Sequence, residues 1–400
     1  MRIILRPVYS QQIEPYIDST LIKVIIGQRR VGKSFILMQL MREIKRRNPS
    51  ARLIYINKED YAFDAVKNHA DLMNWLARDG DHIGKTYLFI DEVQEIEGFE
   101  KALRSLQLSG DYDIYCTGSN ATLLSGELAT FLAGRYIQIR VFALTYNEFL
   151  AFHELDDHPE SLQQYIRYGG MPHLINLVKD ERVYYEYLRN LFDTIVLRDI
   201  ITRHKIRNIG FLQDLILFLA DNIGSLFSAK RISDYLKSQK IGLLPKLVLE
   251  YLHYLESVFF VERVKRTEVG GRKIFEIGDK FYFEDLGMRH ALIPFQQRDI
   301  NKVLENLVYH HLRAGGFRVF IGKLHDREID FVAEKDGRKF YIQVAYLVPD
   351  EKTHEREFGN LLKIEDNFPK MVVSMDEFAS GDYKGIQHWH IRKFLTSFGY

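Results

Sequence analysis

Residues 27–34 read Gly27-Gln28-Arg29-Arg30-Val31-Gly32-Lys33-Ser34, a G-x-x-x-x-G-K-S loop. An apolar run at residues 24–26 precedes it, and a helical stretch begins at Phe35. Glycines let such a loop curl so that its N–H groups and the N-terminus of the next helix face phosphates. The pattern predicts that residues 27–35 bind a nucleoside triphosphate, with Lys33 on the β- and γ-phosphate oxygens and Ser34 Oγ on Mg²⁺.

A second apolar run, at residues 87–90, ends in the acidic pair Asp91-Glu92. In a parallel sheet, such a pair lies where the strand meets its C-terminal loop, at the edge that also carries the phosphate loop. We expect Asp91 to bind the Mg²⁺ shell through water, and Glu92 to polarise the attacking water. The alternative is an ordinary pair of surface acids.

Two further strands are expected, at residues 114–117 and 136–141. The first runs into Gly118-Ser119-Asn120, which makes Asn120 a candidate sensor of the γ-phosphate, although Gly-Ser-Asn is also typical of a turn. Arg135 directly precedes the second strand. Two roles are possible for Arg135: an arginine finger, or a structural partner for a carboxylate. A finger that acts in trans would require an oligomer.

These motifs resemble those of a large prokaryotic family of AAA-type P-loop ATPases. The shared patterns are G-x-R-R-x-G-K-S at residues 27–34, D-E-x-Q at 91–94, T-G-S-N at 117–120 and L-x-G-R-Y at 132–136. The similarity covers essentially the whole chain. It implies ATP as the nucleotide, Mg²⁺ as the metal and a functional role for Arg135. It also implies that the C-terminal half is a domain of unknown function, of the DUF4143-like kind.

The composition is that of an ordinary globular protein. The chain has 400 residues, of which 46% are hydrophobic and 27% charged, enough for two or three domains. We find no signal-peptide pattern and no apolar run long enough to span a bilayer, so we expect a cytoplasmic protein without a membrane partner. The single cysteine, Cys116, rules out a disulfide framework.

The distribution of charge does not decide whether the protein binds nucleic acid. The net charge of +1 argues against a uniformly basic surface, but two local stretches are basic: Arg198, Arg203, Lys205 and Arg207, and then Lys265, Arg266, Arg272 and Lys273. Such stretches are solvated faces in most proteins, and a contact surface is the alternative.

We expect four domains: an ATPase core at residues 1–155, a helical lid at 156–207, a winged-helix-like domain at 208–295 and a C-terminal domain at 296–400. The third has helices at 211–222, 228–237 and 245–256, with Ser228 as an N-cap, and a wing at Gly270-Gly271 between strands at 259–264 and 273–277. Its third helix carries acidic as well as basic residues, which favours packing or protein docking over DNA reading.

The last domain has the order helix, three strands, helix, strand, at about residue 301, then 319–321, 328–334, 339–346, 354–366 and 371–375. This order resembles the restriction-endonuclease-like fold. Glu305, Asp330 and Gln343 match its metal-binding positions, but Ala345 stands where a lysine is expected, and Lys339 or Lys323 would be strained substitutes. A degenerate nuclease fold kept as a binding module is therefore preferred to an active nuclease.

The predicted fold class is α/β: a parallel P-loop sheet with a helical lid, then a winged helix and a restriction-endonuclease-like domain. The predicted function is a Mg²⁺-dependent ATPase that acts as a switch coupled to a C-terminal interaction module. DNA, a protein and a second copy of the chain stay open as partners. The alternatives are an ATP-regulated DNA-binding protein or nuclease and an ATP-binding scaffold without hydrolysis.

Overall fold

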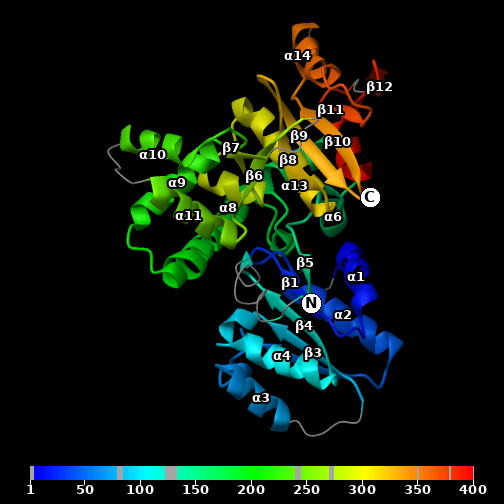
Figure 1. Cartoon of the computed structure of the whole chain (residues 1–400), viewed down its shortest axis with the longest axis vertical. Helices are drawn as coiled ribbons and strands as arrows, with labels where there is room; N and C mark the ends of the chain where they lie inside the picture. Colours follow the sequence, from blue (N-terminus) through cyan, green and yellow to red (C-terminus); the bar gives the residue numbers. More distant parts are fainter. Residues whose placement is uncertain are drawn as a thin grey trace. The chain divides into compact units, whose positions relative to one another are not determined.

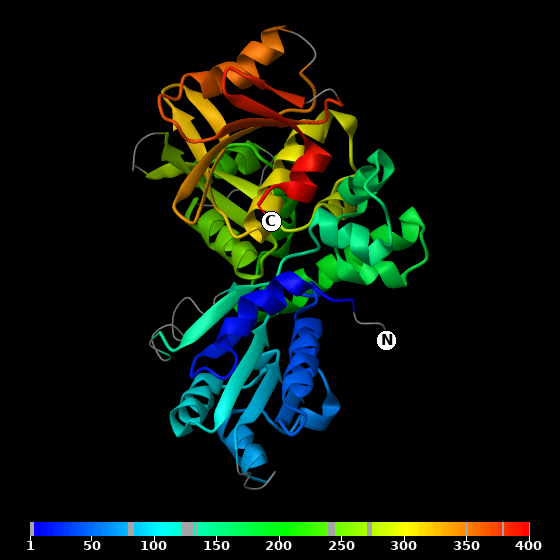
Figure 2. The same cartoon turned by 90° about the vertical axis from the view of Figure 1, so that its right-hand side faces the viewer.

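The structure is a computed structural model that describes residues 4–78, 84–121, 132, 134–238, 245–269, 274–348, 351–377 and 380–399. The chain divides into two compact units, Met1–Phe142 with Ser257–Phe259, and Ala143–Glu256 with Phe260–Tyr400. Figures 1 and 2 show the two units from two sides. We describe each unit by itself, and the boundaries of the four expected domains stay a prediction.

The first unit is built on a parallel sheet. Among the described residues it has five strands in the order β2-β3-β4-β1-β5, and each neighbouring pair is parallel. Their bounds are β1 Ile22–Ile26, β2 Arg52–Asn57, β3 Thr86–Asp91, β4 Tyr112–Gly118 and β5 Tyr136–Arg140. All residues of β1 and β3 are buried, which is typical of a parallel sheet that is covered on both faces.

Helices connect these strands, and in Figure 1 they run alongside the sheet in blue and cyan. Their bounds are α1 Pro7–Ile13, α2 Lys33–Arg47, α3 His69–Arg78 and α4 Phe99–Ser109, with short 3₁₀ turns at Glu14–Tyr16, Tyr61–Phe63 and Val93–Glu95. Apolar side chains of the strands and of α3 and α4 form one core, which also contains Cys116 and Phe259. The expected α/β class is therefore confirmed.

Strand order decides which residues meet. The strand predicted at residues 114–117 is β4, which lies between β3 and β1. Because all five strands are parallel, the ends of β1, β3 and β4 lie at one edge of the sheet, the carboxyl edge. The P-loop follows β1, Asp91 is the last residue of β3 and Glu92 comes next, and Ser119-Asn120 follow β4.

The second unit begins with helices: α6 Tyr146–His153, α7 Pro159–Tyr168, α8 Glu181–Thr194, α9 Ile209–Asp221, α10 Ala229–Ser238 and α11 Pro245–Ser257, with a 3₁₀ turn at Pro172–Asn176 and a π-helical segment at Ile195–Thr202. The break expected after α7 is present. Gly170 N donates a 2.6 Å hydrogen bond to Asp285, whose carboxylate also caps α12 (Leu286–Leu292) through Met288 N. Burial raises the pKa of Asp285 to about 6.

An eight-stranded sheet follows, in the order β12-β13-β11-β10-β9-β8-β6-β7 among the described residues. Its elements are β6 Val261–Glu268, β7 Ile274–Phe283, α13 Ile300–Ala314, β8 Arg318–Leu324, β9 Arg327–Lys335, β10 Arg338–Val344, α14 Glu351–Leu362, β11 Lys370–Ser374, β12 Ser380–Tyr383, β13 Ile386–His390 and α15 Ile391–Ser397. A 3₁₀ turn, Gln297–Asp299, precedes α13. The predicted order of helices and strands from residue 301 to 375 is present, with bounds shifted by up to four residues.

One connection was not expected. Strand β6 of the predicted wing pairs in parallel with β8, at Arg266 with Ile321 and at Glu268 with Lys323. The predicted wing and the predicted C-terminal domain therefore share one sheet (Figure 1). The predicted N-cap is confirmed, since Arg231 N donates to Ser228 Oγ at 3.2 Å. The winged-helix and endonuclease-like assignments stay predictions, and Gly270, Gly271, Arg272 and Lys273 lie outside the described residues.

Within the part of the chain that the structure describes, no helix combines the length and the apolar character needed to cross a membrane.

Candidate functional site

Two glycines shape the loop that follows β1. A Cβ on Gly27 would lie 2.2 Å from the carbonyl oxygen of Val141, so no side chain fits there. Gly32 has a φ of +98°, a left-handed conformation that glycine adopts without strain. Lys33, the first residue of α2, comes directly after Gly32, so the helix begins two residues earlier than predicted. The free N–H groups at the N-terminus of α2 favour the binding of an anion.

Lys33 is folded back on the loop. Its side chain is buried, and Nζ donates to the carbonyl oxygens of Gly27 at 3.1 Å and of Gln28 at 3.0 Å. The same ammonium lies 3.7 Å from Glu92 Oε1. The loop, the helix end and the buried lysine together suit an anionic group such as a phosphate chain.

Asp91 is held by neighbours on both sides of β3. One carboxylate oxygen accepts a hydrogen bond from Tyr55 on β2 at 3.0 Å, and the other accepts from the Thr117 hydroxyl on β4. Only 2% of Asp91 is exposed. Its orientation is therefore fixed by the folded sheet, and a carboxylate oxygen is a ligand that Mg²⁺ accepts.

Glu92 has an unusual backbone. Its φ of 55° is left-handed, which is uncommon for a residue with a side chain and occurs often at functional sites. Thr117 Oγ1 accepts a 2.9 Å hydrogen bond from Glu92 N, and the Gln94 amide donates to the carboxylate. Burial alone would raise the pKa of Glu92, but Lys33, Gln94 and the nearby Arg29 outweigh it, so the net pKa is lowered. Glu92 is therefore a carboxylate at neutral pH.

The rest of the predicted loop lies around this centre. Asn120 is 5% exposed and follows β4 at the carboxyl edge, while Val31 is fully buried. Gln28 is 1% exposed, and neither its amide nitrogen nor its amide oxygen has a hydrogen-bond partner in the described part of the chain. An unpaired buried amide is costly, which is typical of a site that awaits a ligand. Arg30 is exposed, and Phe35 is partly buried in the first turn of α2.

Arg6 was missed by the sequence analysis. It is 2% exposed, and its guanidinium donates to the carbonyl oxygens of Val31 at 2.9 Å and Phe142 at 3.0 Å. The segment before α1 is also bonded to α2, because Gln39 pairs with Ile4 O and Arg6 N. Arg6 thus fastens the loop to the N-terminal segment. No motif marks this arginine, because its partners are backbone atoms.

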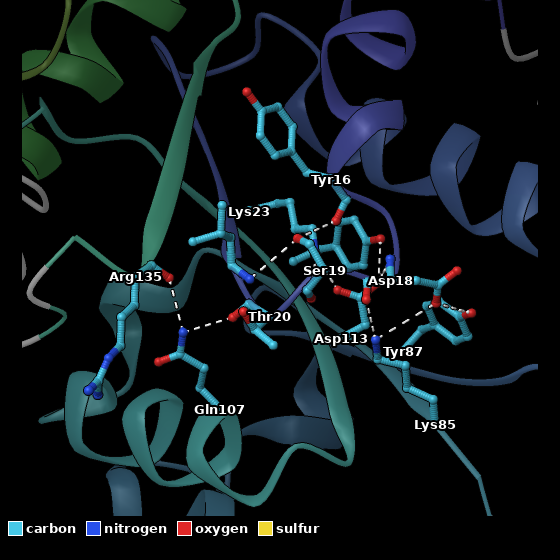
Figure 3. Close-up of polar contacts among 12 residues, drawn as sticks. Tyr16, Asp18, Ser19, Thr20, Lys23, Lys85, Tyr87, Gln107, Asp113 and Arg135 are labelled. Carbon is cyan, nitrogen blue, oxygen red and sulfur yellow. Dashed lines mark hydrogen bonds and ion pairs between the residues drawn. The ribbon is translucent and has the colours of Figure 1, made fainter.

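Arg135 is not brought to the phosphate loop. Its carbonyl oxygen accepts from Ile22 N at the start of β1, so it lies at the amino edge of the sheet, opposite the loop. Figure 3 shows it beside Gln107, which donates to Arg135 O at 3.2 Å, with its guanidinium directed away from the buried ion pair of Lys23 and Asp113. Arg140, which was not predicted, pairs with Ile26 at the carboxyl edge.

The second predicted site gains a lysine that the sequence analysis also missed. Lys280 Nζ on β7 lies 2.6 Å from Glu305 Oε1 and 2.7 Å from Glu328 Oε1. Burial would lower the pKa of Lys280, but the nearby Glu305, Asp330 and Glu328 outweigh it and raise it. Burial and Glu305 raise the pKa of Asp330 well above its usual range. Sequence spacing could not reveal Lys280, because β7 is fifty residues from β9.

A hollow of about 560 Å³ opens beside this cluster, lined by residues that include Arg327, Glu328, Asp330, Gln343 and Asn360. Gln343 Oε1 lies 3.4 Å from Asp330 N, so two of the predicted ligands are in contact. In the described ranges, however, no group of three or more His, Cys, Asp or Glu side chains could hold a metal ion. The ammonium of Lys280 balances part of the charge of these acids.

Known proteins resemble this chain over its length. An AAA domain model matches residues 19–150, and a model of a domain of unknown function, DUF8612, matches residues 159–299. The DUF4143-like character stays a prediction. An uncharacterized protein of Haemophilus influenzae is 35% identical over 385 residues, covering 95% of both chains. Uncharacterized protein MJ1544 of Methanocaldococcus jannaschii is 31% identical over 392 residues, covering 92% of this chain and 86% of its own.

Among solved structures, the Aeropyrum pernix Orc1 protein in complex with DNA aligns with a TM-score of 0.33 and 13% identity, over 73% of this chain and 93% of that one. The two sequence relatives match nearly the whole chain, and the AAA model covers the P-loop and both acids. The chain therefore belongs to a family of AAA-domain proteins in which a domain of unknown function follows the P-loop ATPase-like domain.

Proposed function

We propose that this protein is a Mg²⁺-dependent ATPase whose cycle switches a C-terminal interaction module. The observation that carries the proposal is the convergence at one sheet edge of a buried lysine and two oriented acids. Lys33 lies 3.7 Å from Glu92, and Thr117 is hydrogen-bonded to both Asp91 and Glu92. These are the parts that phosphoryl transfer to water requires: a phosphate cradle, a metal ligand and a group that orients the water.

Each of these residues has a role in the proposed reaction. The N–H groups of the loop and of α2 would bind the phosphates, and Lys33 would exchange its bonds to the loop carbonyls for bonds to phosphate oxygens. Ser34 and Asp91 would hold Mg²⁺, which supplies positive charge for the developing phosphate oxygens. Glu92, as a carboxylate, would accept a hydrogen bond from the attacking water, and Asn120 would contact the γ-phosphate.

An arginine finger in trans is part of the proposal only if the protein assembles. Arg135 lies at the far edge of its own sheet, so it could act only on a neighbouring copy. A homo-oligomer, a protein partner and DNA are the partners we propose to test, and the cytoplasm is the compartment we propose.

The test is steady-state ATP hydrolysis with Mg²⁺ by the full chain and by Lys33→Ala. We expect slow turnover, because a switch waits for its partner, and loss of both binding and turnover in the variant. Hydrolysis by Lys33→Ala at the parent rate would contradict the proposal. The exposed Lys45→Ala on α2 is the matched control and should hydrolyse ATP as the parent does.

A second candidate function is that of an ATP-regulated nuclease, and a specific observation favours it. Lys280, which is in contact with Glu305 and Glu328, would take the place of the lysine that the sequence lacks near Gln343. A cation beside carboxylates is what phosphodiester hydrolysis uses near the attacked phosphate. Following duplex DNA in the same ATPase reactions tests this candidate. Metal-dependent cleavage that is lost in Asp330→Asn would support it, and intact DNA throughout would favour the interaction module.

A further inference from the structure

Arg29, the third residue of the P-loop, has a buried guanidinium. Only 4% of the residue is exposed, and Nη1 donates a 3.1 Å hydrogen bond to Glu59 Oε1. Glu59 lies two residues beyond the end of β2. This contact joins the loop that follows β1 to the loop that follows β2.

The strand order places this contact over the catalytic acids. Strands β1 and β2 are separated by β4 and β3, so their ends lie about 14 Å apart at the usual strand spacing. A side chain that reaches from one loop toward the other must extend over the ends of β4 and β3, where Asp91 and Glu92 lie. The electrostatic effect of Arg29 on Glu92 agrees with this position.

We infer that Arg29 binds the γ-phosphate in the same chain and stabilises its charge during hydrolysis, and that Glu59 holds its guanidinium when no nucleotide is bound. The inference rests on the proposed ATPase function and adds a catalytic residue to it. Arginine suits the role because its planar guanidinium donates to two phosphate oxygens at once.

The ion pair between Arg29 and Glu59 can be broken at low cost. The Glu59 side chain is 40% exposed, whereas that of Arg29 is 5% exposed. An ion pair that is open to water on one side is weak, and a γ-phosphate carries more charge than one carboxylate. Nucleotide binding can therefore replace Glu59 with phosphate oxygens without moving the strands.

Three other arginines near the sheet edges or in the loop do not fit this role. Arg30 is exposed, and Arg135 lies at the opposite edge of the sheet. Arg140 is at the carboxyl edge, but its guanidinium stacks on Phe142 and Phe259, with its centre 4.3 Å and 4.8 Å from the two rings. Arg29 is the arginine of the P-loop whose guanidinium is buried and bonded to the loop that follows β2.

The experiment compares Arg29→Ala, Arg29→Lys and the exposed Arg42→Ala on α2 in the full-length protein, by ATP turnover and by binding of ADP and a non-hydrolysable ATP analogue. We expect Arg29→Ala to lower kcat at least about 100-fold, in line with arginines that act in cis or in trans on phosphoryl transfer. ADP affinity should change less than about threefold, Arg29→Lys should recover part of kcat, and Arg42→Ala should match the parent.

Glu59→Ala gives the complementary result. Without the Glu59 carboxylate, Arg29 loses this ion pair and has one competitor fewer for the γ-phosphate, so the affinity for the ATP analogue should rise while the affinity for ADP stays level. Turnover in Arg29→Ala within threefold of the parent would overturn the inference and leave the ATPase proposal standing. If the parent itself does not hydrolyse ATP, the ATPase proposal fails, and binding then decides the inference. The inference is overturned if the ratio of the affinity for the ATP analogue to the affinity for ADP is the same in Arg29→Ala as in the parent.

Discussion

Lys33 and Thr117 show how single residues shape the candidate site. Lys33 is bonded to carbonyl oxygens of its own loop, and Thr117 donates to Asp91 while accepting from Glu92 N. Lys33 is thereby held beside the loop that would bind phosphates, and Thr117 fixes the positions of both acids before a ligand binds. Preorganised groups of this kind lower the barrier to the chemical step.

Thr117→Val removes the hydroxyl and keeps the shape of the side chain. Asp91 and the backbone of Glu92 each lose a hydrogen bond, so we expect kcat to fall at least about tenfold, in line with the cost of misplacing catalytic groups. Thr117→Ser keeps the hydroxyl and should restore most of the activity. The measurement is steady-state turnover of the three proteins. Equal kcat in Thr117→Val and the parent would mean that the threonine serves packing alone.

Motif residues were found from the sequence because they are contiguous. Gly27, Lys33 and Ser34 follow one strand, and Asp91-Glu92 follow another, so each set can be read from a single stretch. Tyr55, Glu59 and Lys280 could not be found in this way. They reach the sites from other strands and loops, and their positions depend on strand order and on bends in the sheet that spacing does not encode.

At the scale of elements, the N-terminal segment belongs to the P-loop. Arg6 bridges Val31 O on the loop and Phe142 O after β5, and its guanidinium stacks on the Tyr9 ring with its centre 4.6 Å away. The loop is thus held from one side by Arg6 and from the other by α2. The strands and helices of this unit could be predicted because apolar runs and helical periodicity are local signals. The contacts of Arg6 with the loop could not be predicted, because they are tertiary contacts.

Arg6→Ala should loosen the loop. Two buried carbonyl oxygens lose a charged donor, so we expect the free energy of unfolding to fall by about 3 kcal/mol and ATP affinity to weaken. Urea unfolding with titration of a fluorescent ATP analogue measures both. The exposed Arg42→Ala should leave stability within about 0.5 kcal/mol of the parent. A loss of unfolding free energy in Arg6→Ala no larger than in this control would contradict the proposal that Arg6 holds the loop.

At the scale of the whole molecule, two buried histidines of the second unit tie stability to pH. His290 Nδ1 lies 3.1 Å from Arg167 O, and His311 Nε2 lies 2.8 Å from Phe398 O. Burial lowers the pKa of His290 to about 3 and that of His311 to about 4. Both are therefore neutral in the folded protein at physiological pH.

Acidification should reduce the contribution of these two histidines to the stability of the unit. In the unfolded chain both imidazoles take up protons as the pH falls through about 6.5, whereas the folded imidazoles stay neutral. Each histidine should therefore lower the free energy of unfolding by about 1 kcal/mol between pH 7.5 and 5.5. Asp285 and Asp330, whose pKa values are raised, act in the opposite direction, so the effect of His311 is measured as the difference between the parent and His311→Gln in urea unfolding. The stability of His311→Gln should fall less on acidification, or rise more, than that of the parent. The same pH dependence in the two proteins would contradict the assignment.

The family relationship covers nearly the full chain, because the two relatives match both units. What the sequence could not predict at this scale is that β6 of the predicted wing joins the sheet of the C-terminal domain. The pairing brings together strands that are more than fifty residues apart, and no turn or motif between them signals it. The second unit is therefore one sheet with helices, and the proposed switch would act on it as a whole.

The most direct test of the central claim separates binding from turnover in Glu92→Gln. Glutamine keeps the shape of the side chain but cannot act as a carboxylate toward water. The account predicts ATP affinity within a few-fold of the parent and single-turnover hydrolysis slowed at least about 100-fold, in line with the loss of general-base assistance. The exposed Glu95→Gln, on the same turn, should behave as the parent does. Equal hydrolysis by Glu92→Gln and the parent would contradict the claim that this edge of the sheet is an ATPase site.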